Sequence, residues 1–201
     1  MNENLLGKYL TLQEFCTCTQ TYRKYAELID PYPTNLEETI PALKALCQHI
    51  LDPVIEHFGR ERFQLTYGFC SKDLKRFLSQ KDPETGVKNG RVDPSGDQHM
   101  AHEKNRNDKY YCDRLGAACD FQIVELESDR LIEWILEQGL PFDSLYFYGN
   151  EREASQRYRP IHISYGFQHK REIWTFTEKG TPTKRGIKQW ATISKEKDCR
   201  V

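Results

Sequence analysis

The chain has 201 residues, of which 38% are hydrophobic and 29% charged, and its formal net charge is −1. This length suits one domain with a sizeable core, so we expect a single domain over residues 1–201. The near-neutral charge gives no overall signal for nucleic acid, and no apolar run is long enough to span a membrane, so we expect no membrane partner. The N-terminus lacks a basic region followed by an apolar stretch, and the seven Cys are irregularly spaced. We therefore expect a cytoplasmic protein with reduced thiols.

Predicted helices and strands alternate along the chain. The clearest helix signal lies in residues 33–59, where Thr34 or Asn35 can cap the helix and Pro53 is expected to kink or break it. Shorter helices are predicted at residues 71–80 and 128–139. Apolar residues typical of strands occur at residues 62–69, 117–124, 142–148, 159–165 and 170–177. This order indicates an α+β fold with a mostly antiparallel sheet packed with helices.

A carboxylate stands in a segment that otherwise reads as buried. Asp120 ends the run "LGAACD", whose other residues are small or apolar, and a metal ion would explain a charge at this position. Zinc accepts His nitrogen and carboxylate oxygen, and catalytic zinc sites use three protein ligands. Strand alternation in "IHIS" aims His162 and Ser164 to one face of a sheet. His99, Asp120 and His162 are therefore candidate ligands of Zn²⁺ at the sheet face.

Several short segments occur in an order that carries more information than any one of them. They read "LTLQEF", "ILDPVIEHFG", "TYGFCS", "DQHM", "GAACDF", "FDSL" and "IHIS". In this order they resemble the zinc D-Ala-D-Ala carboxypeptidase family of the hedgehog/DD-peptidase zinc superfamily, and most of all its phage-type branch. The resemblance covers residues 9–166 and leaves 167–201 as a C-terminal extension. It implies a small α+β fold with Zn²⁺ held by His99, Asp120 and His162, and hydrolysis of peptide or amide bonds.

Two positions depart from the family's pattern. Cys70 stands where the family has an Arg, and a thiol cannot supply that cation or its fork of donors. We therefore expect weak or absent D-Ala-D-Ala carboxypeptidase activity. Tyr148 stands where the family has a Glu that acts as general base, and Glu151 and Glu153 just beyond it are candidate replacements. Cys70 and Tyr148 then become candidates for contact with a substrate.

Residues 101–114 form an insertion between two of the predicted metal ligands, which are nearly contiguous in the family. Because both ends are anchored near the metal, we expect the segment to pass over or beside the site and to set substrate specificity. His102 is a candidate substrate-binding residue, or a second metal-binding His if it shares a helical face with His99. The alternative is an exposed His in a loop. Ser164, on the same strand face as His162, is a further substrate-binding candidate.

Other cysteines and the basic tail admit competing interpretations. Cys112 and Cys119 could join His residues in a separate zinc site, but their spacing is outside the usual range, and we interpret Cys119 as a core residue. Cys16 and Cys18 are also expected to be small buried residues. Residues 169–190 combine basic and aromatic side chains, which is compatible with nucleic-acid binding. A solvated strand followed by a helix explains this composition better.

Three functions remain open on the sequence. The first is a zinc-dependent hydrolase that acts on a peptide or peptidoglycan-like substrate; the resemblance implies that such an enzyme can reach the cell wall after lysis. The second is a catalytically disabled zinc-binding module that holds a ligand or a protein partner. The third is a zinc hydrolase acting on nucleic acid, the less favoured partner, because a His/Asp/His site does not fix the bond that is cleaved.

Overall fold

A mixed β-sheet forms the centre of the molecule in the computed structural model, which describes residues 5–90, 98–100, 102–148, 158–176 and 182–183. Its strands are β1 (Phe63–Tyr67), β2 (Ala117–Ile123), β3 (Ser144–Phe147), β4 (Ile161–Tyr165), β5 (Glu172–Phe176) and β6 (Pro182–Thr183). Their order across the sheet is β1-β2-β4-β3-β5-β6, and neighbouring strands are antiparallel except β3 and β5, which are parallel. The α+β prediction is confirmed, and the sheet is mostly antiparallel as expected.

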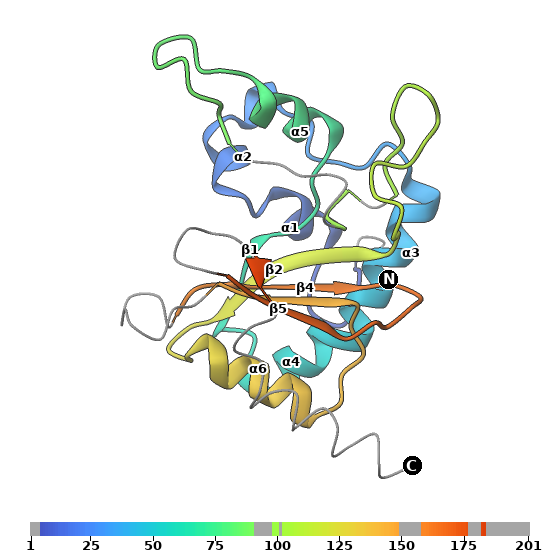
Figure 1. Cartoon of the computed structure of the whole chain (residues 1–201), viewed down its shortest axis with the longest axis vertical. Helices are drawn as coiled ribbons and strands as arrows, with labels where there is room; N and C mark the ends of the chain where they lie inside the picture. The colour runs from blue at the N-terminus through green and yellow to red at the C-terminus, as the bar shows by residue number, and fades with distance from the viewer. Residues whose placement is uncertain (1–4, 91–97, 101, 149–157, 177–181, 184–201) are drawn as a thin grey trace.

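Helices lie on both sides of this sheet (Figure 1). In the view of Figure 1, α1 (Leu12–Thr17), α2 (Gln20–Lys24) and α5 (Lys72–Ser79) lie above the sheet, and α4 (Asp52–Phe58) and α6 (Ser128–Glu137) lie below it. A short 3-10 helix, η1 (Ala26–Leu28), follows α2. Within the described residues, no helix is long and apolar enough to cross a membrane.

The main hydrophobic core lies on one face of the sheet. Strand alternation sends Phe121, Ile161 and Ile163 to this face, where each has 0% exposure. They pack with α3 (Leu36–Leu46), α4 and α6, whose apolar residues belong to the same cluster. Cys119 is fully buried there as well, so its interpretation as a core residue is confirmed. The opposite face of β2 and β4 is left for Asp120 and His162.

Residues 36–58 form the predicted long helix with one irregular turn. Between α3 and α4 lies η2 (Cys47–Leu51), a π-helical turn. Pro53 explains this turn, because it has no N–H to donate to the carbonyl of His49 four residues earlier. The run ends at Gly59, whose φ of 92° is in the region that favours glycine. Asn35 stands at the N-cap as predicted, but its amide donates to the carbonyl of His102 instead of capping the helix.

A second, smaller cluster packs beyond the other face of the sheet. Leu74 and Leu78 of α5 and Cys70 just before it belong to this cluster. Ile29, just after η1, and Met100, next to His99, complete it. Tyr22 and Tyr25 of the α2 region pack against it. Met100 has 0% exposure, so the neighbouring His99 is anchored to a hydrophobic core and does not sit on a loose loop.

Candidate metal centre

Three elements bring the predicted ligands together. Asp120 in β2 and His162 in β4 are direct cross-strand partners. The register of β1 against β2 shifts between Leu65 and Tyr67, which places a bulge opposite Asp120. Such irregularities redirect side chains next to functional sites. His99 comes from the segment between α5 and β2, and its carbonyl accepts a hydrogen bond from the Cys70 N–H at 3.1 Å.

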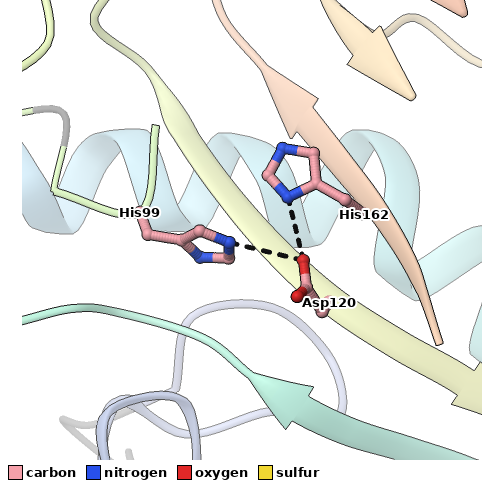
Figure 2. Close-up of side chains that lie close together, drawn as sticks. All are labelled: His99, Asp120 and His162. Carbon is pink, nitrogen blue, oxygen red and sulfur yellow. Dashed lines mark hydrogen bonds and ion pairs between the residues drawn. The ribbon is translucent and has the colours of Figure 1, made fainter. Parts of the chain in front are cut away.

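The two imidazole rings point at the same carboxylate oxygen (Figure 2). His162 Nδ1 lies 2.8 Å and His99 Nε2 lies 3.3 Å from Asp120 Oδ1. One ligand atom from each of the three residues can be chosen so that all lie within 4.8 Å of one another. His99 and His162 are 6% and 2% exposed, whereas the Asp120 side chain is 24% exposed, so the group is shielded from water except at the carboxylate. This buried His-Asp-His group could hold a metal ion.

A backbone carbonyl fixes the orientation of His99. The Nδ1 atom of His99 lies 2.6 Å from the carbonyl oxygen of Gly68, which can only accept a hydrogen bond. In a neutral ring Nδ1 then carries the proton, and the Nε2 lone pair faces Asp120. A lone pair and a carboxylate at 3.3 Å repel each other unless a proton or a cation lies between them. Gly68 itself passes so close to Phe15 that a Cβ there would collide with the Phe15 carbonyl oxygen.

His162 has a complementary environment. Its Nε2 is buried and has no hydrogen-bond partner among the described residues. The ring of Tyr146 stacks on it, with 4.4 Å between ring centroids and 26° between planes. Burial alone would raise the pKa of Asp120, but the hydrogen bond from His162 and the proximity of His99 outweigh it and hold that pKa below its ordinary value. Asp120 is therefore an anion, as a metal ligand must be.

No other group of this kind supports the alternative site with Cys112 and Cys119. Within the described part of the chain, one group of three metal-ligating side chains lies close together, namely His99, Asp120 and His162. Cys112 and Cys119 are both 0% exposed free thiols. Cys16 and Cys18 are buried too, as predicted, and burial raises the pKa of each thiol to about 12. Burial also raises the pKa of the Cys119 thiol, so Cys16, Cys18 and Cys119 are neutral side chains of the core.

Comparisons with known proteins do not identify the chain. No family model, no curated protein and no solved structure matches it. The resemblance over residues 9–166 therefore stays a hypothesis that rests on the short segments of the sequence. What the structure adds to it independently is the convergence of His99, Asp120 and His162.

Two predicted substrate-binding residues are buried in the structure. Cys70 is 1% exposed and packs in the second cluster, so its thiol does not line an opening of the site. Ser164 is 0% exposed, and its hydroxyl accepts a hydrogen bond from the Ser144 N–H at 3.1 Å. The alternation that places Ser164 on the face of His162 was predicted correctly. The neighbouring strand β3 covers its hydroxyl, which sequence alone did not indicate.

His102 makes structural contacts with both ring nitrogens, and of its three interpretations from the sequence the exposed loop residue is wrong. It is 7% exposed, so it is not an exposed loop residue. Its Nδ1 faces Glu38 at 3.3 Å, and its Nε2 accepts a hydrogen bond from the Gly116 N–H at 3.1 Å. With both ring nitrogens engaged, His102 is available neither to a metal nor to a substrate. It ties the insertion to α3 and to the start of β2.

The insertion packs mainly on the helices. The Tyr110 hydroxyl donates to Glu38 at 2.7 Å, and the buried Glu103 contacts Thr34 and Lys72. The segment was expected to pass over or beside the metal site, and its two parts differ in this respect. Its first part clamps the N-termini of α3 and α5, and its last part turns back to the sheet. There Arg114 Nη1 donates to the Ser144 hydroxyl at 2.9 Å.

The contact between Tyr110 and Glu38 gives a testable titration. The hydrogen bond from Tyr110 is the largest cause that holds the pKa of Glu38 at about 2, below the ordinary value of 4.5. We expect Tyr110→Phe to raise this pKa toward 4.5, measured by carboxyl NMR titration. Because the folded-state pKa is lowered, the stabilising effect is complete above the unfolded value and is lost as pH falls toward 2. Tyr111→Phe is the control, and an unchanged Glu38 pKa in Tyr110→Phe would contradict the assignment.

The remaining candidates from the sequence are Tyr148, Glu151 and Glu153. Tyr148 is half-buried and stacks on Phe176, with centroids 4.9 Å apart, so it stays a candidate for substrate contact. Glu151 and Glu153 lie outside the described residues. Two neighbours of the site were missed from the sequence, Tyr146 on His162 and Tyr67 edge-on to His99 at 4.6 Å. Alternation in β3 could have placed Tyr146 on a face with Tyr148, but the pairing of β3 with β4 was needed to bring it to His162.

Proposed function

We propose that this protein is a zinc-dependent hydrolase of peptide or amide bonds. The observation that carries the proposal is the His99 ring, whose Nδ1 is bound to the Gly68 carbonyl while its Nε2 faces Asp120. A partner on the second ring nitrogen that fixes the tautomer is typical of metal-binding His residues. The same three residues are those that the resemblance to zinc D-Ala-D-Ala carboxypeptidases implies as ligands.

Three residues of the site would bind the metal ion, and two others would hold the ligands in place. His99 Nε2, Asp120 and His162 would hold the ion, and three protein ligands leave a position for water or substrate, as in catalytic zinc sites. A zinc ion bound there would supply Lewis acidity that polarises a carbonyl and lowers the pKa of a water molecule. Gly68 fixes the orientation of His99, and Tyr146 covers one face of the His162 ring.

The donor set narrows the choice of metal. Two imidazoles and one carboxylate suit zinc, whereas magnesium and calcium prefer oxygen ligands. The same donor set also occurs around iron(II) in oxygenases. Zinc is the metal of the proposal because the resemblance implies it, and elemental analysis of the purified protein distinguishes the two.

A second candidate function is a zinc-binding module without catalysis. Tyr148 stands where the resembling family has its general base, and Cys70, at the place of the family's Arg, is buried in a hydrophobic cluster. Neither side chain can do the work of the residue it replaces. The nucleic-acid alternative depended on residues 169–190, of which 177–181 and 184–190 lie outside the described part of the chain.

One experiment separates these functions. The purified protein is analysed for metal, stripped with a chelator, reloaded with zinc, and assayed on a panel of peptides that includes D-Ala-D-Ala. We expect one zinc per chain, amide hydrolysis that disappears on stripping and returns on reloading, and weak turnover of D-Ala-D-Ala. Zinc binding without hydrolysis of any peptide would favour the non-catalytic module. A protein that binds no zinc would overturn both.

A further inference from the structure

Arg114 brings a positive charge to the face of the sheet that carries the metal ligands. It is half-buried, and its Nη1 donates to the Ser144 hydroxyl at 2.9 Å. Burial would lower the pKa of Arg114, but its interactions with the side chains of Tyr146 and Cys112 outweigh burial and raise that pKa. Ser144 and Tyr146 both belong to β3, and their side chains lie on the same face because they are two residues apart.

Tyr146 connects this arginine to the metal ligands. Tyr146 and His162 are directly opposite in the register of β3 and β4, and their rings stack at 4.4 Å. The guanidinium of Arg114 therefore contacts an aromatic residue that itself stacks on the candidate ligand His162. No motif predicted this, because Arg114 belongs to the insertion and reaches the site only through the fold.

We infer that Arg114 binds a carboxylate of the substrate next to the metal site, an inference that rests on the proposed function. A guanidinium has five donors in a planar fork that matches a carboxylate, and it can donate to several acceptors at once. Its contacts with Ser144 and Tyr146 restrict the side chain in advance, which lowers the entropy cost of binding. Partial burial strengthens a charged contact relative to one in water.

The chemistry favours a carboxylate over a phosphate. The proposed substrate is a peptide, whose anionic groups are carboxylates, and the planar fork of a single guanidinium matches the two oxygens of a carboxylate. The substrate of this site is thus an amide with a carboxylate on the β3 side of the metal ligands. Position 70, where the resembling family has its Arg, follows β1 on the other side of β2 and β4, so weak turnover of D-Ala-D-Ala is still expected. Arg114 acts as a residue that sets specificity and positions this group.

The test uses thiols that carry a carboxylate or its uncharged amide. The cobalt-substituted full chain is titrated with 3-mercaptopropionate and with 3-mercaptopropionamide, and binding is read from the visible cobalt spectrum. Mercaptoacetate and 4-mercaptobutyrate, each with its amide, vary the distance between the thiol and the carboxylate. The thiol contacts the metal equally in both members of a pair, so the ratio of their affinities reports on the carboxylate alone.

We expect the wild type to bind the carboxylate about tenfold or more tightly than the amide at one chain length or more. Arg114→Gln should abolish this preference and leave the affinity for the amide unchanged, and Arg114→Lys should retain part of it. Arg130→Gln is the matched control, since Arg130 is an exposed arginine of α6 paired with Glu133, and it should keep the full preference.

Each contrary outcome is informative. Failure to take up cobalt, or to bind any thiol, would overturn the proposed function. Thiol binding with no preference for the carboxylate in the wild type, or a preference that survives in Arg114→Gln, would overturn the role of Arg114 and leave the metal site intact. Tighter binding of 2-mercaptoethylphosphonate than of the carboxylates would overturn the choice of a carboxylate. If Arg114→Gln does not fold, the test is the carboxylate preference of the wild type and its partial loss in Arg114→Lys.

Discussion

Replacing His162 by Ala is expected to lower the affinity for zinc about a thousandfold while the chain stays folded. Zinc binds to protein sites with roughly 10–16 kcal/mol, so the loss of one of three ligands costs on the order of 4 kcal/mol. At about 1.4 kcal/mol per decade, this corresponds to about three decades in the dissociation constant. His99→Ala should have an effect of the same size, because its Nε2 also faces Asp120.

The measurement is a competition between the protein and a chromophoric chelator of known affinity, together with elemental analysis of the purified variants. His49→Ala is the matched control, since His49 is an exposed histidine that stacks on Tyr165 away from the three ligands. It should bind zinc like the wild type. Full zinc occupancy in both His99→Ala and His162→Ala would show that zinc binds elsewhere in the chain.

The placement of Asp120 and His162 on one face of the sheet could be predicted from the sequence because its signals are local. Asp120 stands out as a charge in a small, apolar strand, and alternation separates His162 from Ile161 and Ile163. Period-two alternation is a property of the strand itself and needs no knowledge of its neighbours. The predicted strands correspond to β1, β2, β3, β4 and β5 for the same reason.

The surroundings of the site could not be predicted, because they depend on contacts between distant segments. Position 70 could be matched to a motif, but the direction of a small apolar thiol depends on Met100 and α5, which form a cluster around it. The insertion has no periodicity, so the burial of His102 and the approach of Arg114 to β3 had no signal in the sequence. The parallel pairing of β5 with β3 likewise follows only from the complete sheet.

Replacing Glu103 by Ala is expected to lower the free energy of unfolding by about 2–4 kcal/mol. Glu103 is 0% exposed, and its carboxylate accepts hydrogen bonds from the Thr34 N–H and the Thr34 hydroxyl, both at 2.6 Å. It also pairs with Lys72 at 3.2 Å. Alanine would leave a cavity at this buried position and would remove the acceptor of both Thr34 donors and the partner of Lys72.

Denaturant unfolding of the chelated protein measures this effect, since a bound metal would add its own stabilisation to the folded state. Glu103→Gln keeps the shape and one acceptor oxygen but loses the charge, so its destabilisation should lie between those of the wild type and Glu103→Ala. Asp108→Asn is the control from the same segment. Its side chain is 88% exposed, so the change should stay within about 0.5 kcal/mol.

The same contacts predict the effect of replacing most of the insertion. A short Gly-Ser linker in place of residues 103–112 would remove Glu103 and the fully buried Cys112, and with Tyr110 the hydroxyl that binds Glu38. Such a chain should be less stable than Glu103→Ala, because it loses buried apolar contact in addition to the polar network. If Glu103→Ala and the linker variant both unfold like the wild type, the insertion is not a brace between α3 and α5. A loss of stability in Glu103→Ala, with an unchanged ratio of carboxylate to amide binding, would separate this bracing role from the specificity assigned to Arg114.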